Sequence, residues 1–162
     1  MKVIYAGSFD PVTNGHLDII KRAKEIFGEV IVAVLKNTAK NSLFTVEERL
    51  DLLREVLKDE DNIEIDFFEG LLVDYARSKN CTTIVRGLRS TGDYLSEYNL
   101  AMANMHYKDG VETVFLLGSS NHLFVSSTLA KEVAIFDGDL SLFVPEVVGK
   151  AMKEKLGGKL WI

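Results

Sequence analysis

Short apolar runs alternate with longer amphipathic stretches along this chain. The runs predict five strands, at residues 3–6, 30–35, 63–68, 83–85 and 114–117. Most of them are continuously apolar and rich in β-branched residues, which is typical of strands covered on both faces of a sheet. The run at residues 63–68 alternates apolar and polar residues instead, so we expect it at an edge.

The stretches between the runs carry helical patterns. In the first stretch apolar residues recur at helical spacing, at Leu17, Ile20, Ala23 and Phe27. Gly28 follows them as a C-terminal stop. Thr45 and Glu48 form the two ends of a capping box that opens a second helix. Three more helices are predicted at residues 71–78, 94–107 and 128–136. Pro145 suits the first turn of a last helix, which runs to about Lys155.

Strand alternating with helix predicts an α/β fold: a single-domain, Rossmann-like five-stranded parallel sheet with helices on both faces. The chain has neither an internal repeat nor a linker, so residues 1–162 form one predicted domain. Sheets of this type bind ligands outside the carboxyl ends of their strands. We therefore expect the functional residues directly after the apolar runs.

Composition narrows the function classes. The net charge of −5 argues against an extended nucleic-acid surface, although 19 Lys and Arg allow a small phosphate pocket. The single cysteine, Cys81, excludes an internal disulfide and suits a reducing cytoplasm. The first apolar stretch is too short for a signal peptide or a membrane span. We expect a cytoplasmic protein without nucleic-acid or membrane partners.

The segment after the first run has the features of a phosphate site. Gly7 lets backbone approach a ligand closely, and the next helix start presents unpaired N–H groups. His16 lies in the first turn of that helix, where it can donate a hydrogen bond to a phosphoryl oxygen, and Gly15 leaves the approach open. A lone histidine more often caps or packs, but this context favours function. Ser8 either binds phosphate or closes a turn, whereas Asp10 is expected to cap the turn.

Other strand ends carry basic or hydroxyl side chains. Arg86 and Arg89 follow the fourth run, where a guanidinium suits bidentate phosphate binding and a structural salt bridge is the alternative. Lys40 lies in a polar loop, where lysines are usually solvated. Residues 126–128 carry hydroxyls that either cap the next helix or form a second phosphate cradle. Residues 87–92 have the glycine spacing of a Walker loop but lack its Lys and Ser or Thr, and no Cys/His spacing suggests zinc.

Four segments together resemble a known family: residues 7–16, 44–49, 86–89 and 126–132. The first resembles the TxGH signature of the nucleotidyltransferase superfamily, and the set is similar to the bacterial phosphopantetheine adenylyltransferases. That resemblance implies transfer of the adenylyl group of ATP to 4'-phosphopantetheine, which gives dephospho-coenzyme A and pyrophosphate. It also implies Mg²⁺ as cofactor, a homohexamer and coenzyme A as a feedback ligand.

The resemblance also assigns residues by position. His16 would stabilise the transition state at the α-phosphate. The acceptor would be bound by Ser8, Lys40, Leu72, Arg86 and Asn104. ATP would be bound by Ser8, Phe9, His16, Gly87, Leu88, Arg89, Glu97, His122, Leu123, Phe124, Val125, Ser126, Ser127 and Thr128. No protein residue is assigned to the metal. Ala6 stands where proline is common in the family, and His122 stands where an aromatic residue is common.

The implied nucleophile is a phosphomonoester with a second pKa of ~6, so at neutral pH it is already an anion and needs no general base. Direct attack on ATP then requires no covalent enzyme intermediate. Catalysis would consist of aligning two anions and neutralising the developing charge with His16, Arg89, helix N-termini and Mg²⁺.

Three alternatives compete with this interpretation. The nearest is another small nucleotidyltransferase, of the cytidylyltransferase or nicotinamide mononucleotide adenylyltransferase type; the segment at residues 86–89 and the chain length favour phosphopantetheine. A phosphoacceptor receiver would need acidic residues after the first strand and an aspartate after the third, where Glu69 and Gly70 stand. A regulator without catalysis is disfavoured because His16 and both arginines are retained.

Overall fold

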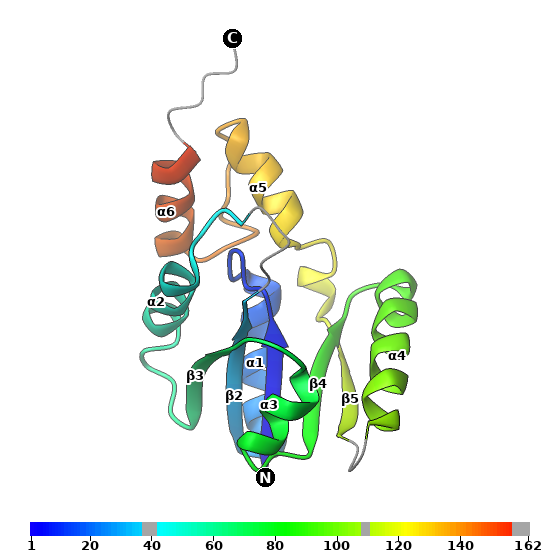
Figure 1. The fold of residues 1–162 in the computed structure, drawn as a ribbon. Helices are drawn as coiled ribbons and strands as arrows, with labels where there is room; N and C mark the ends of the chain where they lie inside the picture. The colour runs from blue at the N-terminus through cyan, green and yellow to red at the C-terminus, as the bar shows by residue number, and fades with distance from the viewer. Residues whose placement is uncertain (37–41, 108–110, 157–162) are drawn as a thin grey trace.

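A computed structural model describes residues 1–36, 42–107 and 111–156 of the chain. Five parallel strands form one sheet with helices on both faces (Figure 1). The strands are β1 (Lys2–Gly7), β2 (Glu29–Leu35), β3 (Ile63–Phe68), β4 (Thr83–Leu88) and β5 (Glu112–Leu117). The helices are α1 (Asn14–Phe27), α2 (Val46–Val56), α3 (Leu72–Ser78), α4 (Thr91–His106), α5 (Ser127–Ile135) and α6 (Glu146–Leu156), with a 3₁₀ turn, η1 (Ser120–His122). The predicted fold class is confirmed.

The order of the strands is β3-β2-β1-β4-β5. In the central strand, Ile4 is paired in register with Ile31 of β2 on one side and with Ile84 of β4 on the other. The chain thus leaves β1 toward β2 and β3, and then returns to build the other half of the sheet from β4. This reversal opens a crevice at the carboxyl ends of β1 and β4, which is where parallel sheets bind ligands.

The two edge strands differ from each other. β3 alternates in sequence and lies at an edge, as predicted. β5 reads as a strand covered on both faces, but it forms the other edge and is only half-buried; its last residue, Leu117, is 69% exposed. The expectation of full cover was therefore wrong for β5. The reason is topological, since no described strand pairs with its outer side.

Side-chain caps set the helix boundaries. The hydroxyl of Thr45 accepts the N–H of Glu48, whose carboxylate accepts the N–H of Thr45, so the predicted capping box of α2 is confirmed. α1 ends before Gly28, which has a φ of 93° that glycine adopts without strain. α4 begins three residues earlier than predicted because the hydroxyl of Ser90 caps it, accepting the N–H of Asp93.

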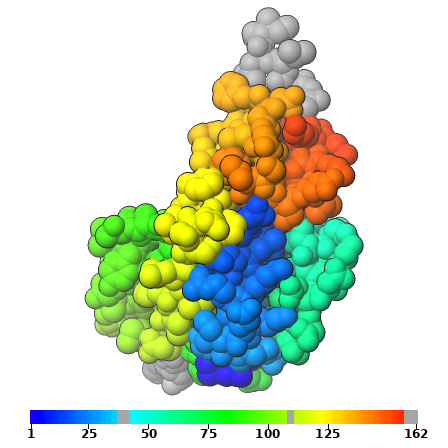
Figure 2. Space-filling view, turned by 180° about the vertical axis from the view of Figure 1, so that it is seen from behind, coloured from blue at the N-terminus to red at the C-terminus, as the bar shows by residue number. Residues whose placement is uncertain are grey.

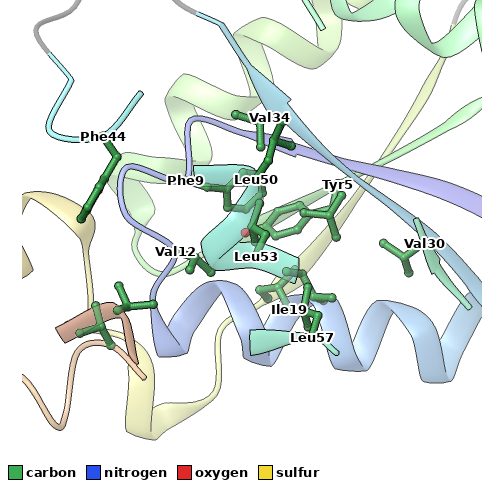
Figure 3. Close-up of a cluster of buried hydrophobic side chains, with 14 of the residues drawn as sticks. Tyr5, Phe9, Val12, Ile19, Val30, Val34, Phe44, Leu50, Leu53 and Leu57 are labelled. Carbon is green, nitrogen blue, oxygen red and sulfur yellow. The ribbon is translucent and has the colours of Figure 1, made fainter. Parts of the chain in front are cut away.

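Alternate residues of β1 belong to two separate hydrophobic clusters on the two faces of the sheet. Val3 and Tyr5 belong to the larger cluster, which also includes side chains from α1, α2, α5 and α6 (Figure 3). Ile4 and Ala6 point to the opposite face, where α3 packs. Each buried aliphatic side chain contributes about 1.5–3 kcal/mol, so this packing anchors α1 firmly beside β1.

The layers bring distant segments to the carboxyl edge of the sheet. Seen from behind, α1 lies between α2 and the segment around residue 120 (Figure 2). A Cβ on Gly15 in the first turn of α1 would stand 3.7 Å from the carbonyl oxygen of His122, so η1 and the start of α1 meet directly. No helix in the described parts of the chain is long and apolar enough to cross a membrane.

Candidate active site

A cavity of about 200 Å³ opens at the switch point between β1 and β4. Its walls come from the β1–α1 loop, the first turns of α1, the end of β4, α4 and the segment after β5. The predicted site residues that line it are Ser8, His16, Arg86, Gly87, Leu88, Arg89, Glu97, His122 and Val125. Residues from five separate segments therefore meet in one pocket.

His16 is both a cap and a free donor. The N–H of Thr13 donates to Nδ1 of His16 at 3.1 Å, while the N–H of His16 donates to the Thr13 hydroxyl at 3.2 Å. Because a backbone N–H can only donate, Nδ1 must be the unprotonated nitrogen. The proton of the neutral ring then lies on Nε2, for which the described residues provide no hydrogen-bond partner. His16 can therefore cap the helix through Nδ1 and donate to a ligand through Nε2.

The ring of His16 is uncharged at neutral pH. Burial lowers the pKa of His16 to about 4, and the nearby charges of Arg89 and Arg86 act in the same direction. The Phe9 ring packs edge-on against the imidazole, with centroids 5.1 Å apart, and keeps it in place. Phe9 itself is 1% exposed, so its side chain supports the histidine from behind rather than facing the cavity. His16 thus presents a fixed, neutral N–H at a helix N-terminus.

The two arginines at the end of β4 have different partners. Arg86 forms a bidentate pair with Glu97, with Nε to Oε2 at 2.5 Å and Nη2 to Oε1 at 2.6 Å, and its Nη1 donates to the carbonyl oxygen of Ala6. Arg89 donates from Nε to Asp93 at 3.1 Å and from Nη1 to the carbonyl oxygen of Val125 at 2.9 Å. The salt-bridge alternative therefore describes both side chains in this state, and both still border the cavity.

A second cavity of about 310 Å³ adjoins the first. It extends between β1, β4, α3 and α4 over mainly apolar side chains. Four of the five residues predicted for the acceptor line it: Ser8, Leu72, Arg86 and Asn104. The fifth, Lys40, lies outside the described residues. Five residues line both cavities and stand at their boundary: Ala6, Gly7, Ser8, Arg86 and Glu97.

The segment after β5 is only partly directed at the first cavity. His122 and Val125 line it, and Nδ1 of His122 lies 2.9 Å from the hydroxyl of Ser119. Leu123 and Phe124 are not among its lining residues; they are 44% and 51% exposed, and Phe124 packs on Phe143.

Two of the three hydroxyl side chains at residues 126–128 form hydrogen bonds within the protein. Ser126 caps α5 by accepting the N–H of Leu129 at 3.1 Å, so the capping alternative is confirmed for Ser126. Ser127 donates to the carbonyl oxygen of Pro11 at 2.8 Å and ties α5 to the β1–α1 loop. Thr128 is exposed at the start of α5. A cradle here would consist of the N–H groups of α5 more than of hydroxyls.

Asp10 does not cap its own turn, and this expectation is corrected. Its buried carboxylate accepts the N–H of Leu43 at 3.0 Å and of Phe44 at 2.9 Å, more than 30 residues away. Arg49, also buried, lies 3.9 Å from this carboxylate and donates to the carbonyl oxygen of Ser8 at 3.1 Å. The sequence analysis included Arg49 in the segment at residues 44–49 but assigned it no role, because charged residues on helices are usually solvated. The pair fixes the backbone at Ser8.

A parallel α/β sheet with a neutral histidine donor, a helix N-terminus and two arginines at its switch point defines a nucleotidyltransferase. The model of the cytidylyltransferase-like family matches residues 4–133. The chain belongs to this family and, within it, to the phosphopantetheine adenylyltransferases. It is 52% identical over 156 residues to the phosphopantetheine adenylyltransferase of Alkaliphilus metalliredigens, over 96% of this chain and 99% of that protein. The enzyme of that name from Caldanaerobacter subterraneus is 50% identical over 152 residues, 94% of this chain and 95% of that protein.

The fold is also found in a solved structure of low sequence identity. The nicotinic acid mononucleotide adenylyltransferase of Plasmodium falciparum, complexed with NaAD, superposes with a TM-score of 0.68 at 15% identity. The match covers 97% of this chain and 96% of that one. This likeness confirms the Rossmann-like architecture, and at such low identity it carries no information about the substrate.

Proposed function

We propose that this protein transfers the adenylyl group of ATP to 4'-phosphopantetheine, giving dephospho-coenzyme A and pyrophosphate in coenzyme A biosynthesis. One observation carries the proposal beyond the family match: two cavities of different character meet at Ser8 and Arg86. A transfer between two phosphates requires two binding places that share a boundary. The relatives of about 50% identity bear the name of this reaction.

ATP occupies the first cavity in this proposal. The backbone at Gly87 and Leu88, the Arg89 guanidinium and the segment at residues 122–128 hold it, as the family resemblance assigns. Gly87 belongs to this set for a physical reason, because a Cβ there would stand 2.9 Å from Ile19 and crowd the cavity wall. The N-termini of α1 and α5 add positive potential for the triphosphate.

The acceptor occupies the second cavity, with its pantetheine arm along Leu72 and Asn104 and its phosphate at Ser8, Arg86 and Lys40. The phosphate oxygen attacks the α-phosphorus, a P–O bond forms, and the bond to the β-phosphate breaks to release pyrophosphate. His16 donates from Nε2 to the α-phosphate oxygens as their charge develops. Since the ring is already neutral, it stabilises that charge without transferring a proton.

Mg²⁺ fits this site as a companion of the nucleotide. In the described parts of the chain no three His, Cys, Asp or Glu side chains lie grouped to hold a metal, and Arg86 engages Glu97, the acidic residue of the cavity wall. Mg²⁺ commonly binds substrate phosphates and water with few protein ligands. Bound in that way, it would neutralise charge on the departing pyrophosphate.

The test is pyrophosphate release from ATP and Mg²⁺ with and without 4'-phosphopantetheine, with dephospho-coenzyme A followed by chromatography. Release that depends on this acceptor supports the proposal. A panel with nicotinamide mononucleotide as acceptor, and with CTP in place of ATP, tests the other nucleotidyltransferase types. Greater turnover with either of these would refute the assignment to phosphopantetheine.

We further propose a cytoplasmic homohexamer, with coenzyme A as a feedback ligand. The assembly comes from the family resemblance, and the surface of α4 supports it. Large apolar side chains of α4 outside the second cavity are exposed: Tyr94, Leu95, Tyr98, Met102 and Met105. A surface of this kind on a small domain is typical of contact with another protein.

A further inference from the structure

The Nε and Nη2 edge of Arg86 is already occupied in this structure. The Nε and Nη2 edge of a guanidinium is a fork that binds carboxylate or phosphate in a bidentate manner. Both carboxylate oxygens of Glu97 occupy that fork, at 2.5 and 2.6 Å. Nη1 donates to the carbonyl oxygen of Ala6, so three of the five guanidinium N–H groups are used. A phosphate that approaches Arg86 by the same fork must therefore displace Glu97.

The position of the pair adds a second, independent observation. Arg86 and Glu97 belong to the walls of both cavities, so the ion pair stands between the nucleotide side and the acceptor side. Both side chains are largely shielded, 23% and 17% exposed. Burial lowers the pKa of Arg86, but the hydrogen bond and charge of Glu97 outweigh it and hold the pKa above its usual value. The pair is therefore a bidentate and largely shielded contact at the place where the two substrates would meet.

We infer that Glu97 is an internal competing anion, which occupies the acceptor phosphate's place on Arg86 in the free protein and is displaced when the acceptor binds. This inference rests on the proposed function, which puts the acceptor phosphate at Arg86. Displacement frees the Glu97 carboxylate to remain on the nucleotide side of the boundary. The acceptor phosphate wins the competition because it is a dianion at neutral pH, whereas Glu97 carries one charge.

The competition also acts after the reaction. Once the acceptor phosphate has become part of the diphosphate of the product, its phosphorus keeps one charged oxygen instead of two. The attraction of Arg86 for it falls, while the charge of Glu97 stays the same. The return of Glu97 to the fork then favours departure of the product. Glu97 thus lowers the affinity for both acceptor and product.

A purely positioning role for Glu97 would have the opposite consequence. If the carboxylate only held Arg86 in place, neutralising it would leave the guanidinium less ordered and weaken phosphate binding. If it competes, the apparent dissociation constant equals the intrinsic one divided by the fraction of molecules in which the fork is open. A fork closed in about nine molecules of ten weakens binding about tenfold. The sign of the change therefore separates the two roles.

The experiment is calorimetric titration without ATP, using 4'-phosphopantetheine and pantetheine, on the wild type and Glu97→Gln. We expect Glu97→Gln to bind 4'-phosphopantetheine about tenfold more tightly and pantetheine, which lacks the phosphate, with unchanged affinity. The double variant Glu97→Gln with Arg86→Gln should lose the gain. Glu25→Gln, on the exposed side of α1, is the matched control for removal of one negative charge, and should bind as the wild type does.

Equal or weaker binding of 4'-phosphopantetheine by Glu97→Gln would overturn the inference, and the proposed function would stand if the wild type still binds this acceptor through Arg86. If the wild type neither binds it nor releases pyrophosphate in its presence, the proposed function fails and the same variants are titrated with inorganic phosphate. A gain that needs Arg86 then upholds the competing anion, and no gain refutes it. Glu97→Asp, whose shorter side chain closes the fork less well, should give a smaller gain and serves if Glu97→Gln does not fold.

Discussion

His16 uses its two ring nitrogens for different purposes. Nδ1 accepts the Thr13 N–H and completes the cap of α1, which leaves the proton on Nε2, the nitrogen free to face the cavity. The reaction needs no general base, because the proposed nucleophile is already an anion. His16 can therefore act as a hydrogen-bond donor alone. The hydrogen bond from Thr13 that completes the helix cap therefore also orients His16 for catalysis.

Replacing His16 by alanine should therefore lower kcat far more than it weakens substrate binding. Loss of one donor to a developing charge costs on the order of 100- to 1000-fold in rate. Steady-state kinetics with both substrates varied gives kcat and each KM. Turnover near that of the wild type would remove His16 from the proposed role.

The lowered pKa of His16 also predicts how stability depends on pH. The folded protein holds the ring neutral down to a pKa of about 4, whereas the unfolded chain takes up a proton near the ordinary histidine pKa of 6.5. Between these values the unfolded state binds more protons, so this group makes the protein less stable as pH falls from about 6.5 toward 4. Urea unfolding at pH 7 and pH 5 should show a smaller loss for His16→Gln than for the wild type. Equal losses in the two proteins would contradict the buried neutral ring.

At the scale of elements, Asp10 and Arg49 join three segments that the sequence keeps far apart. Asp10 accepts two N–H groups of the α2 entry and pairs with Lys131 of α5 at 3.3 Å, while Arg49 of α2 reaches back to the carbonyl oxygen of Ser8. The backbone that carries Ser8 into both cavities is held by these contacts.

Arg49→Leu should destabilise the fold by about 2–4 kcal/mol, because it leaves a buried carboxylate with Lys131 and two N–H groups but without its guanidinium neighbour. Urea unfolding measures this loss. Arg54→Leu is the matched control, since Arg54 lies on the same helix and its pair with Asp51 is exposed. We expect a change within about 0.5 kcal/mol for the control. A similar loss in both variants would show that the burial of Arg49 is irrelevant.

Some features of the helices and strands depend on neighbouring residues, and others depend on residues far apart in the sequence. The caps at Thr45 and Gly28 were predicted because the cap and its partner lie within a few residues of each other. The start of α4 was placed three residues late, although Ser90 is a good cap, because residues 91–93 lack an apolar pattern. The edge position of β5 depends on strand order, which no local pattern contains.

At the scale of the whole molecule, the exposed apolar surface of α4 predicts assembly. The wild type should sediment at close to six times the 18.1 kDa mass of the chain. Leu95→Glu places a charge on this surface, since Leu95 is 63% exposed, and should shift the protein to smaller species. Leu142→Glu is the matched control, because Leu142 is equally exposed in the segment before α6 and should leave the assembly unchanged. A monomeric wild type would refute the hexamer.

The sequence by itself determined the fold class, the five strands and most helices, because apolar periodicity and caps act within a few residues. It also led to His16, Arg86 and Arg89 as candidates, because parallel strands place their following residues at one edge. Only the tertiary structure decided which donor atoms of these residues already have a hydrogen-bond partner. The tautomer of His16, the Glu97 carboxylate on Arg86 and the burial of Asp10 with Arg49 all arise between segments distant in the chain. Such contacts depend on strand order and helix packing, which a linear pattern does not encode.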